Sequence, residues 1–250
     1  MASAKEKSKV HKLSLKGSSK LVAEFFEYSI HSILFQRGVY PADDFTVVKK
    51  YGLNMLVSAD DQVKAYIKKI MSQLSKWMLA GKISKLVIVI TDKDTGDHVE
   101  RWQFDVHFSN TTPSLSHEFG LLLTAIHKQV QITSKTSKMR SPINPVGNEN
   151  ASPAAPPTTS SAPTEKTEKE IQDEIQAIFR QITASVTFLP MLDGNCTFNV
   201  LVYADADSEV PLEWGDSDAK EIENGEKVQL RSFSTNSHRV DTMVSYRLAE

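Results

Sequence analysis

Cysteine is nearly absent from this chain, with Cys196 the single one among 250 residues. One thiol can form no internal disulfide, and it falls short of the several ligands that a structural zinc ion needs. Long apolar runs are missing as well, since no stretch approaches the ~20 residues that cross a bilayer. The opening residues, MASAKEKSKVHK, lack the apolar core of a signal peptide. We therefore expect a protein of the reducing cytosol or nucleus with no membrane partner.

An excess of charge of one sign is also missing. The chain has 29 lysines and arginines against 31 aspartates and glutamates, a formal net charge of -2. Proteins that bind nucleic acids normally present a strongly basic face to the phosphates, so this balance argues against a nucleic-acid partner. The 40% of hydrophobic residues is usual for a globular protein, and a chain of this length can bury a substantial core.

Signatures of catalysis are scarce. The sequence has no glycine-rich phosphate loop, no nucleophile elbow and no zinc-type histidine pair. Residues 92–96 (DKDTG) resemble the start of a calcium loop but lack its later ligands, so hairpin-turn chemistry explains them better. The strongest enzyme hypothesis pairs Cys196 with a distant histidine. In the competing interpretation, Cys196 alternates with Phe198 and Val200 on a core face and acts as a small apolar side chain. We predict no catalytic residue, no cofactor and no metal.

Three segments show the apolar spacing of helices. They cover residues 18–37, 61–79 and 168–185, with Gly38 and Gly81 as stop signals after the first two. Residues 85–91 form a continuous β-branched run, which is typical of a central strand covered on both faces. In residues 100–108, aromatic side chains alternate with polar ones, which predicts a strand with one face in water. Further strands are predicted at residues 186–192, 196–203, 228–233 and 239–248.

The order of these elements defines the fold class. Helices and strands follow one another without regular βαβ repeats, which predicts an α+β fold with a mainly antiparallel sheet. Residues 110–166 interrupt it, and their latter part is rich in Pro, Ser, Thr, Ala and Asn, so we predict a disordered insert. Helical spacing from Leu115 to Val130 indicates a short amphipathic helix as an alternative for the earlier part. Residues 1–12 are expected to be a flexible N-terminus.

Five sequence motifs in the same order, some made of two strings, resemble a known family. They are VAEFF (22–26) with SILFQRGVYP (32–41), ERWQFD (100–105), IQDEI (171–175) with RQITA (180–184), VTFLP (186–190), and LRSF (230–233) with MVSY (243–246). Together they are similar to the HORMA-domain family and, more narrowly, to its spindle assembly checkpoint proteins of the mitotic-arrest-deficient-two type. The resemblance spans nearly all of residues 13–108 and 168–248. HORMA adaptors of translesion synthesis or of the meiotic chromosome axis are the alternatives within the fold.

The resemblance implies a fold and a way of working. Residues 13–250 would form a single HORMA domain, with a mainly antiparallel sheet packed on three helices and interrupted by the insert at about 110–166. Residues 204–250 would be a mobile "safety belt" that repacks between an open and a closed fold. In the closed fold, a partner's extended peptide adds to the sheet edge beneath this belt. Residues expected to clasp the peptide share apolar or aromatic character: Trp214, Phe233, Met243, Val244 and Tyr246.

The resemblance also implies partners. They are the mitotic-arrest-deficient-one coiled-coil protein and the activator of the anaphase-promoting complex, whose inhibition delays anaphase. Open and closed copies would form a self-dimer through Arg180 and Gln181. The expected location is the nucleus, the kinetochore and the cytoplasm. The implied protein is an adaptor and no enzyme.

Overall fold

The computed structural model describes residues 13–109, 121–125, 166–192 and 195–248. The chain divides into two compact units, of which the first comprises Met1–His127 with Glu165–Glu250, and the second comprises Lys128–Thr164. The second unit lies outside the described residues, as does the predicted flexible segment 1–12. The described helices and strands all belong to the first unit.

The three predicted helices are present. They are α1 (Leu15–Gln36), α2 (Asp61–Leu79) and α3 (Glu168–Ala184). Each begins at a side chain that accepts a hydrogen bond from a free backbone N–H of the first turn, as Asp60 does from Val63. Thr167 and Glu170 form a reciprocal capping box at the start of α3. Local sequence therefore determines where these helices begin.

A sheet of eight strands lies beside the helices. Its order is β7-β5-β6-β3-β4-β10-β8, with β9 paired to β10, and all of these pairings are antiparallel. The strands are β3 (Ile83–Asp92), β4 (His98–Phe108), β5 (Leu121–Ala125), β6 (Cys196–Ala204), β7 (Trp214–Asp216), β8 (Glu226–Gln229), β9 (Phe233–Ser234) and β10 (His238–Tyr246). The predicted α+β class with a mainly antiparallel sheet is confirmed.

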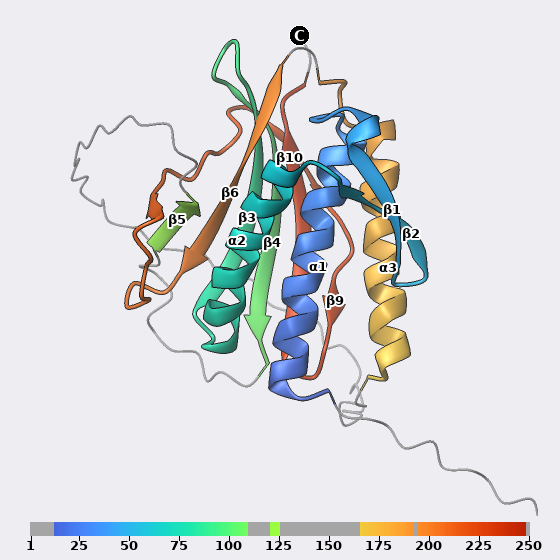
Figure 1. Ribbon diagram of the computed structural model, residues 1–250, viewed down its shortest axis with the longest axis vertical. Helices are drawn as coiled ribbons and strands as arrows, with labels where there is room; N and C mark the ends of the chain where they lie inside the picture. Colours follow the sequence, from blue (N-terminus) through green and yellow to red (C-terminus); the bar gives the residue numbers. More distant parts are fainter. Residues whose placement is uncertain (1–12, 110–120, 126–165, 193–194, 249–250) are drawn as a thin grey trace, which may run out of the picture. The chain divides into compact units, whose positions relative to one another are not determined.

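The core lies between the helices and one face of the sheet (Figure 1). Phe25 of α1 is its centre, with its ring 4.8–5.7 Å from those of Phe104, Phe179 and Phe233. The other face of β3 is also closed, because Val87 and Val89 are fully buried with Leu201. The prediction of a central strand covered on both faces is therefore confirmed.

Two local predictions differ from the structure, and one hairpin was missed. Residues 186–192 form no strand: a short 3-10 turn, Ser185–Thr187, is followed by irregular chain with Met191 85% exposed. The strand predicted at 228–233 is split into β8 and β9. A hairpin of β1 (Phe45–Lys50) and β2 (Leu53–Ser58) was not predicted. Its turn uses positive φ at Tyr51 and Gly52, and the unusual tyrosine there conceals the turn signal.

The insert contributes one strand to the sheet. Leu121–Ala125 forms β5, where the sequence predicted a disordered segment or an amphipathic helix. The physical reason is that β6 presents a free edge to which an extended segment can add. Residues 110–120 and 126–165 lie outside the described residues, so the prediction for the rest of the insert stays a prediction.

Candidate functional site

One edge of β6 is the candidate site. Its other edge pairs with β3 along the whole strand, from Ile83↔Ala204 to Asp92↔Cys196. On the candidate edge β5 runs antiparallel to β6, and β7 lies outside β5 (Figure 1). The edge therefore takes up an extended segment through backbone hydrogen bonds, and the segment is enclosed by a further strand.

The predicted safety belt begins where β6 ends and is first held against α2. Trp214 in β7 is 5% exposed, and its ring lies 5.0 Å from the ring of Trp77. The Trp77 indole Nε1 donates to the carbonyl oxygen of Glu209 at 3.1 Å. Lys82 forms an ion pair with Asp207 on the surface. The first half of the belt is thus attached to the body by a buried aromatic pair and an exposed ion pair.

The belt then crosses the face of the sheet that the helices leave free. There the guanidinium of Arg101, whose side chain is 1% exposed, donates from Nε to the carbonyl oxygen of Ala219 at 3.2 Å. Its other nitrogens reach Glu221 at 3.2 Å and Gln103 Oε1 at 2.6 Å. The strand β4 was predicted to have one face in water, and this is wrong at Arg101 and Gln103. Both are buried: residues 219–221 contact Arg101, and Gln103 is hydrogen-bonded to Arg101 and Asp105.

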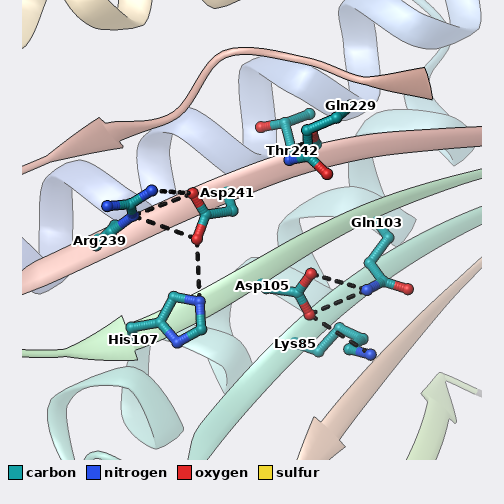
Figure 2. Close-up of polar contacts among 8 residues, drawn as sticks. All are labelled: Lys85, Gln103, Asp105, His107, Gln229, Arg239, Asp241 and Thr242. Atoms are coloured by element: carbon teal, nitrogen blue, oxygen red, sulfur yellow. Dashed lines mark hydrogen bonds and ion pairs between the residues drawn. The ribbon is translucent and has the colours of Figure 1, made fainter. Parts of the chain in front are cut away.

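The belt ends on the opposite edge of the sheet. β10 pairs with β4 from His238↔Phe108 to Tyr246↔Glu100, and β8 adds to β10. Polar side chains line this strand pair, as Figure 2 shows: His107 Nε2 lies 3.1 Å from Asp241, and Gln229 donates to the carbonyl oxygen of Thr242 at 3.0 Å. The belt therefore passes from one edge of the sheet to the other.

The five predicted clasp residues do not meet at one place. Trp214 flanks β5 at the β6 edge, where Ala125 is its Cα partner. Phe233 and Val244 are buried in the core, Phe233 against Phe25 of α1 and Val244 opposite Trp102 of β4. Met243 and Tyr246 are partly buried on β10. Four of the five therefore lie in β9 and β10, at the far edge of the sheet. Their predicted role in clasping a peptide stays a prediction.

The two predicted self-association residues differ in setting. Arg180 is exposed on α3, at a groove of about 320 Å³ whose lining includes Phe35 and Leu53. Gln181 is half-buried, and its Oε1 accepts a hydrogen bond from the backbone N–H of Arg231 at 2.7 Å. Gln181 is thus engaged with the belt, whereas Arg180 is available to a partner. Their predicted role in self-association stays a prediction.

Chemistry at Cys196 is unfavourable for a nucleophile. Its side chain is half-buried, and burial raises the pKa of the thiol, with Asp92 and Glu100 adding to the effect. Because the thiolate is the reactive form, a raised pKa lowers reactivity. Among the described residues, no group of three metal-ligating side chains lies close enough to hold an ion. No helix in that part of the chain is long and apolar enough to cross a membrane.

Comparison with known proteins agrees with this architecture. The HORMA domain family matches residues 18–238. The mitotic spindle checkpoint component mad2 of Schizosaccharomyces pombe is 51% identical over 235 residues, which cover 94% of each chain. The mitotic spindle assembly checkpoint protein MAD2A of Homo sapiens is 39% identical, covering 94% of this chain and 93% of that protein.

Solved structures of related proteins are also similar to this chain. A chain in the crystal structure of the mitotic checkpoint complex superposes with a TM-score of 0.69 at 48% identity, covering 93% of this chain and 99% of that one. Caenorhabditis elegans HTP-2, solved bound to a closure motif of HTP-3, shares the fold alone, with a TM-score of 0.61 at 12% identity over 94% of this chain and 87% of that one.

The chain belongs to the HORMA-domain family. Within that family, it is a spindle checkpoint component of the Mad2 group. The family consists of non-enzymatic adaptors, so the prediction that this chain is no enzyme is confirmed.

Proposed function

We propose that this checkpoint component captures extended peptide segments of its partners at the β6 edge and encloses them with the safety belt. The observation that carries the proposal is the path of residues 204–248. They leave β6, flank the strand position beside it, cross the free face of the sheet and add to β4 at the far edge. A segment held beside β6 is bound by backbone hydrogen bonds and can leave only after the belt opens, so release is slow.

The partners and the switch follow from the resemblance. The proposed ligands are segments of the mitotic-arrest-deficient-one coiled-coil protein and of the activator of the anaphase-promoting complex, and holding the activator delays anaphase. The chain would act at kinetochores, in the nucleus and in the cytoplasm. Repacking of the belt between an open and a closed fold requires two arrangements that differ by only a few kcal/mol.

Two experiments test this function. In a pull-down with immobilised peptides, the chain should retain segments of the two checkpoint partners, and segments of translesion or meiotic-axis proteins should not compete. Ion-exchange chromatography of the purified protein should resolve two slowly interconverting folds. Retention of translesion or meiotic segments alone would assign the chain to another HORMA pathway.

The Arg101 contact should control how long a captured peptide stays. In Arg101→Met, the belt loses its hydrogen bond at Ala219 and its ion pair at Glu221, both made by a buried guanidinium. Removing one member of a buried charged contact costs about 2 kcal/mol or more, so release should accelerate roughly thirtyfold. Stopped-flow displacement of a labelled partner peptide measures the rate. Lys82→Met removes the exposed pair with Asp207 and is the matched control, with little expected effect.

Arg180→Ala should weaken self-association and leave peptide capture unchanged. Arg180 lies off the buried stripe of α3, so its removal should shift stability by no more than about 0.5 kcal/mol. An interface arginine often contributes about 2 kcal/mol, which corresponds to roughly a thirtyfold loss of association. Sedimentation velocity measures the dimer, with the exposed Lys169→Ala on the same helix as control. An unchanged dimer would return Arg180 to an ordinary surface charge.

A further inference from the structure

The strand position beside β6 is filled by the chain itself. β5 has four Cα partners on β6, from Leu121↔Ala204 to Thr124↔Leu201. On its other side it has three on β7, from Leu123↔Asp216 to Ala125↔Trp214. We infer that residues 121–125 are a built-in ligand that occupies the peptide-binding edge and must leave before a partner segment enters. This inference rests on the proposed function for the identity of the competing ligand.

Occupation by β5 excludes a second segment at the same place. The opposite edge of β6 is fully paired with β3, so an added strand can use only the edge that β5 holds. A backbone N–H or C=O of β6 that is hydrogen-bonded to β5 cannot form the same ladder bond with a second strand. Binding of a partner segment and binding of residues 121–125 are therefore alternatives.

The built-in ligand also helps to hold the belt closed. β7 belongs to the belt, and β5 is the strand with which it pairs in the sheet. When β5 leaves, β7 loses this pairing and keeps the packing of Trp214 on Trp77. Departure of the insert strand and opening of the belt entrance are thus coupled.

An internal competitor has a large advantage over a free peptide. A segment tethered in the same chain acts at an effective concentration on the order of millimolar. If its intrinsic affinity equals that of a partner peptide with a Kd of about 1 μM, the edge is free about one time in a thousand. The apparent affinity for the partner then falls by about the same factor. The insert would therefore set the concentration of partner segment that is needed for capture.

Cross-linking tests whether the edge is occupied in solution. Leu122 and Tyr203 are Cα partners, and facing residues of antiparallel strands lie about 4.5–5.5 Å apart, within reach of a disulfide. Leu122→Cys with Tyr203→Cys, in a Cys196→Ala background, should cross-link on mild oxidation without any peptide. Leu122→Cys with Asn199→Cys is the control, since four positions along β6 separate the thiols by about 13 Å. Absence of the first cross-link overturns the inference.

A peptide added in trans provides the second test. The probe is a fluorescent peptide of residues 117–129 of this chain. Leu123→Pro removes a backbone N–H from the middle of β5 and should free the edge, so this variant should bind the probe at least about tenfold tighter than the wild type. Leu123→Val keeps strand propensity and is the matched control, with the affinity of the wild type. Equal affinities in all three proteins also overturn the inference.

The outcomes separate this inference from the proposed function. If the cross-link forms and the probe binds to Leu123→Pro, but neither the wild type nor the variant captures any partner segment, the built-in ligand stands and the proposed function fails. If partner segments bind equally well to the wild type and to Leu123→Pro, and the cross-link is absent, the proposed function stands and the built-in ligand fails. The cross-link does not depend on how Leu123→Pro folds.

Discussion

A chain that ends at Val240 should lose the capture of partner peptides. Truncation before Asp241 removes the pairing of Asp241–Tyr246 with β4. It also removes all the β10 residues with which β8 pairs. With net contributions of about 1 kcal/mol per backbone hydrogen bond, the belt loses several kcal/mol of attachment. Release of a bound peptide should therefore accelerate at least about a hundredfold, which corresponds to about 3 kcal/mol. Surface plasmon resonance with immobilised partner peptide measures the release rate.

The domain itself should stay folded in this truncation. The helices and their contacts with β3, β4 and β6 remain, although the core loses the buried side chain of Val244. Far-ultraviolet circular dichroism should retain its helical signal, and the free energy of unfolding should fall by about 2–3 kcal/mol. A shorter truncation after Tyr246 is the control, because it leaves all of β10 in place. Undiminished capture in the longer truncation would show that β10 does not fasten the belt.

Local signals in the sequence were sufficient for the helices and the central strands. The apolar stripes of α2 and α3 predict the bounds of both helices to within one residue, and the structure shows that Asp60 and Thr167 cap them. The β-branched run at 85–91 predicts β3 because a strand covered on both faces needs apolar side chains on both. In each case the information lies within the segment itself.

The missed features depend on residues far away in the chain. Arg101 fits the alternation of a strand with one face in water, but residues 219–221, far along the chain, contact its buried guanidinium. β5 is a strand because the β6 edge offers partners, whereas its own spacing favours a helix. The segment 186–192 has the composition of a strand but finds no neighbouring strand, so it stays irregular.

Three of the strings that carry the family resemblance meet at one buried ion pair. Arg37, directly after α1, lies with Nε 2.7 Å from Glu100 Oε2 on β4, and the two side chains are 5% and 1% exposed. The same guanidinium donates to the carbonyl oxygen of Pro190, and Trp102 Nε1 donates to the other oxygen of Glu100. Burial raises the pKa of Glu100, and Arg37 opposes that shift. The pair joins α1, β4 and the segment after α3.

Breaking the pair between Arg37 and Glu100 should strongly lower the free energy of unfolding. Glu100→Gln keeps the shape and leaves a buried cation unpaired, and Arg37→Met leaves a buried anion. Each should lower the free energy of unfolding by about 3–5 kcal/mol, a large share of the roughly 5–15 kcal/mol typical of a domain. The double variant should recover much of the loss, because it buries no charge. Urea denaturation at neutral pH measures all three.

The pH dependence separates the two single variants. In Arg37→Met, only the hydrogen bond from Trp102 still opposes the effect of burial, so the folded pKa of Glu100 lies further above its unfolded value near 4.5 than in the wild type. Between the unfolded and the folded pKa of Glu100, the folded state of this variant binds more protons than the unfolded state. Its stability relative to the wild type should therefore rise as the pH falls through that range. Glu100→Gln lacks the titrating group and should show no such recovery.

The stability of each variant has to be compared with that of the wild type at the same pH, because two histidines also titrate. Burial lowers the pKa of His31 and His238 to about 4 in all the proteins, and each group therefore destabilises the fold as the pH falls below about 6.5. The histidine contributions cancel in the difference between variant and wild type. Arg247→Met, which removes an exposed pair with Asp97, is the surface control and should cost at most about 1 kcal/mol. If the two single variants, the double variant and Arg247→Met all lose the same small amount of unfolding free energy, the buried pair contributes no more than a surface contact.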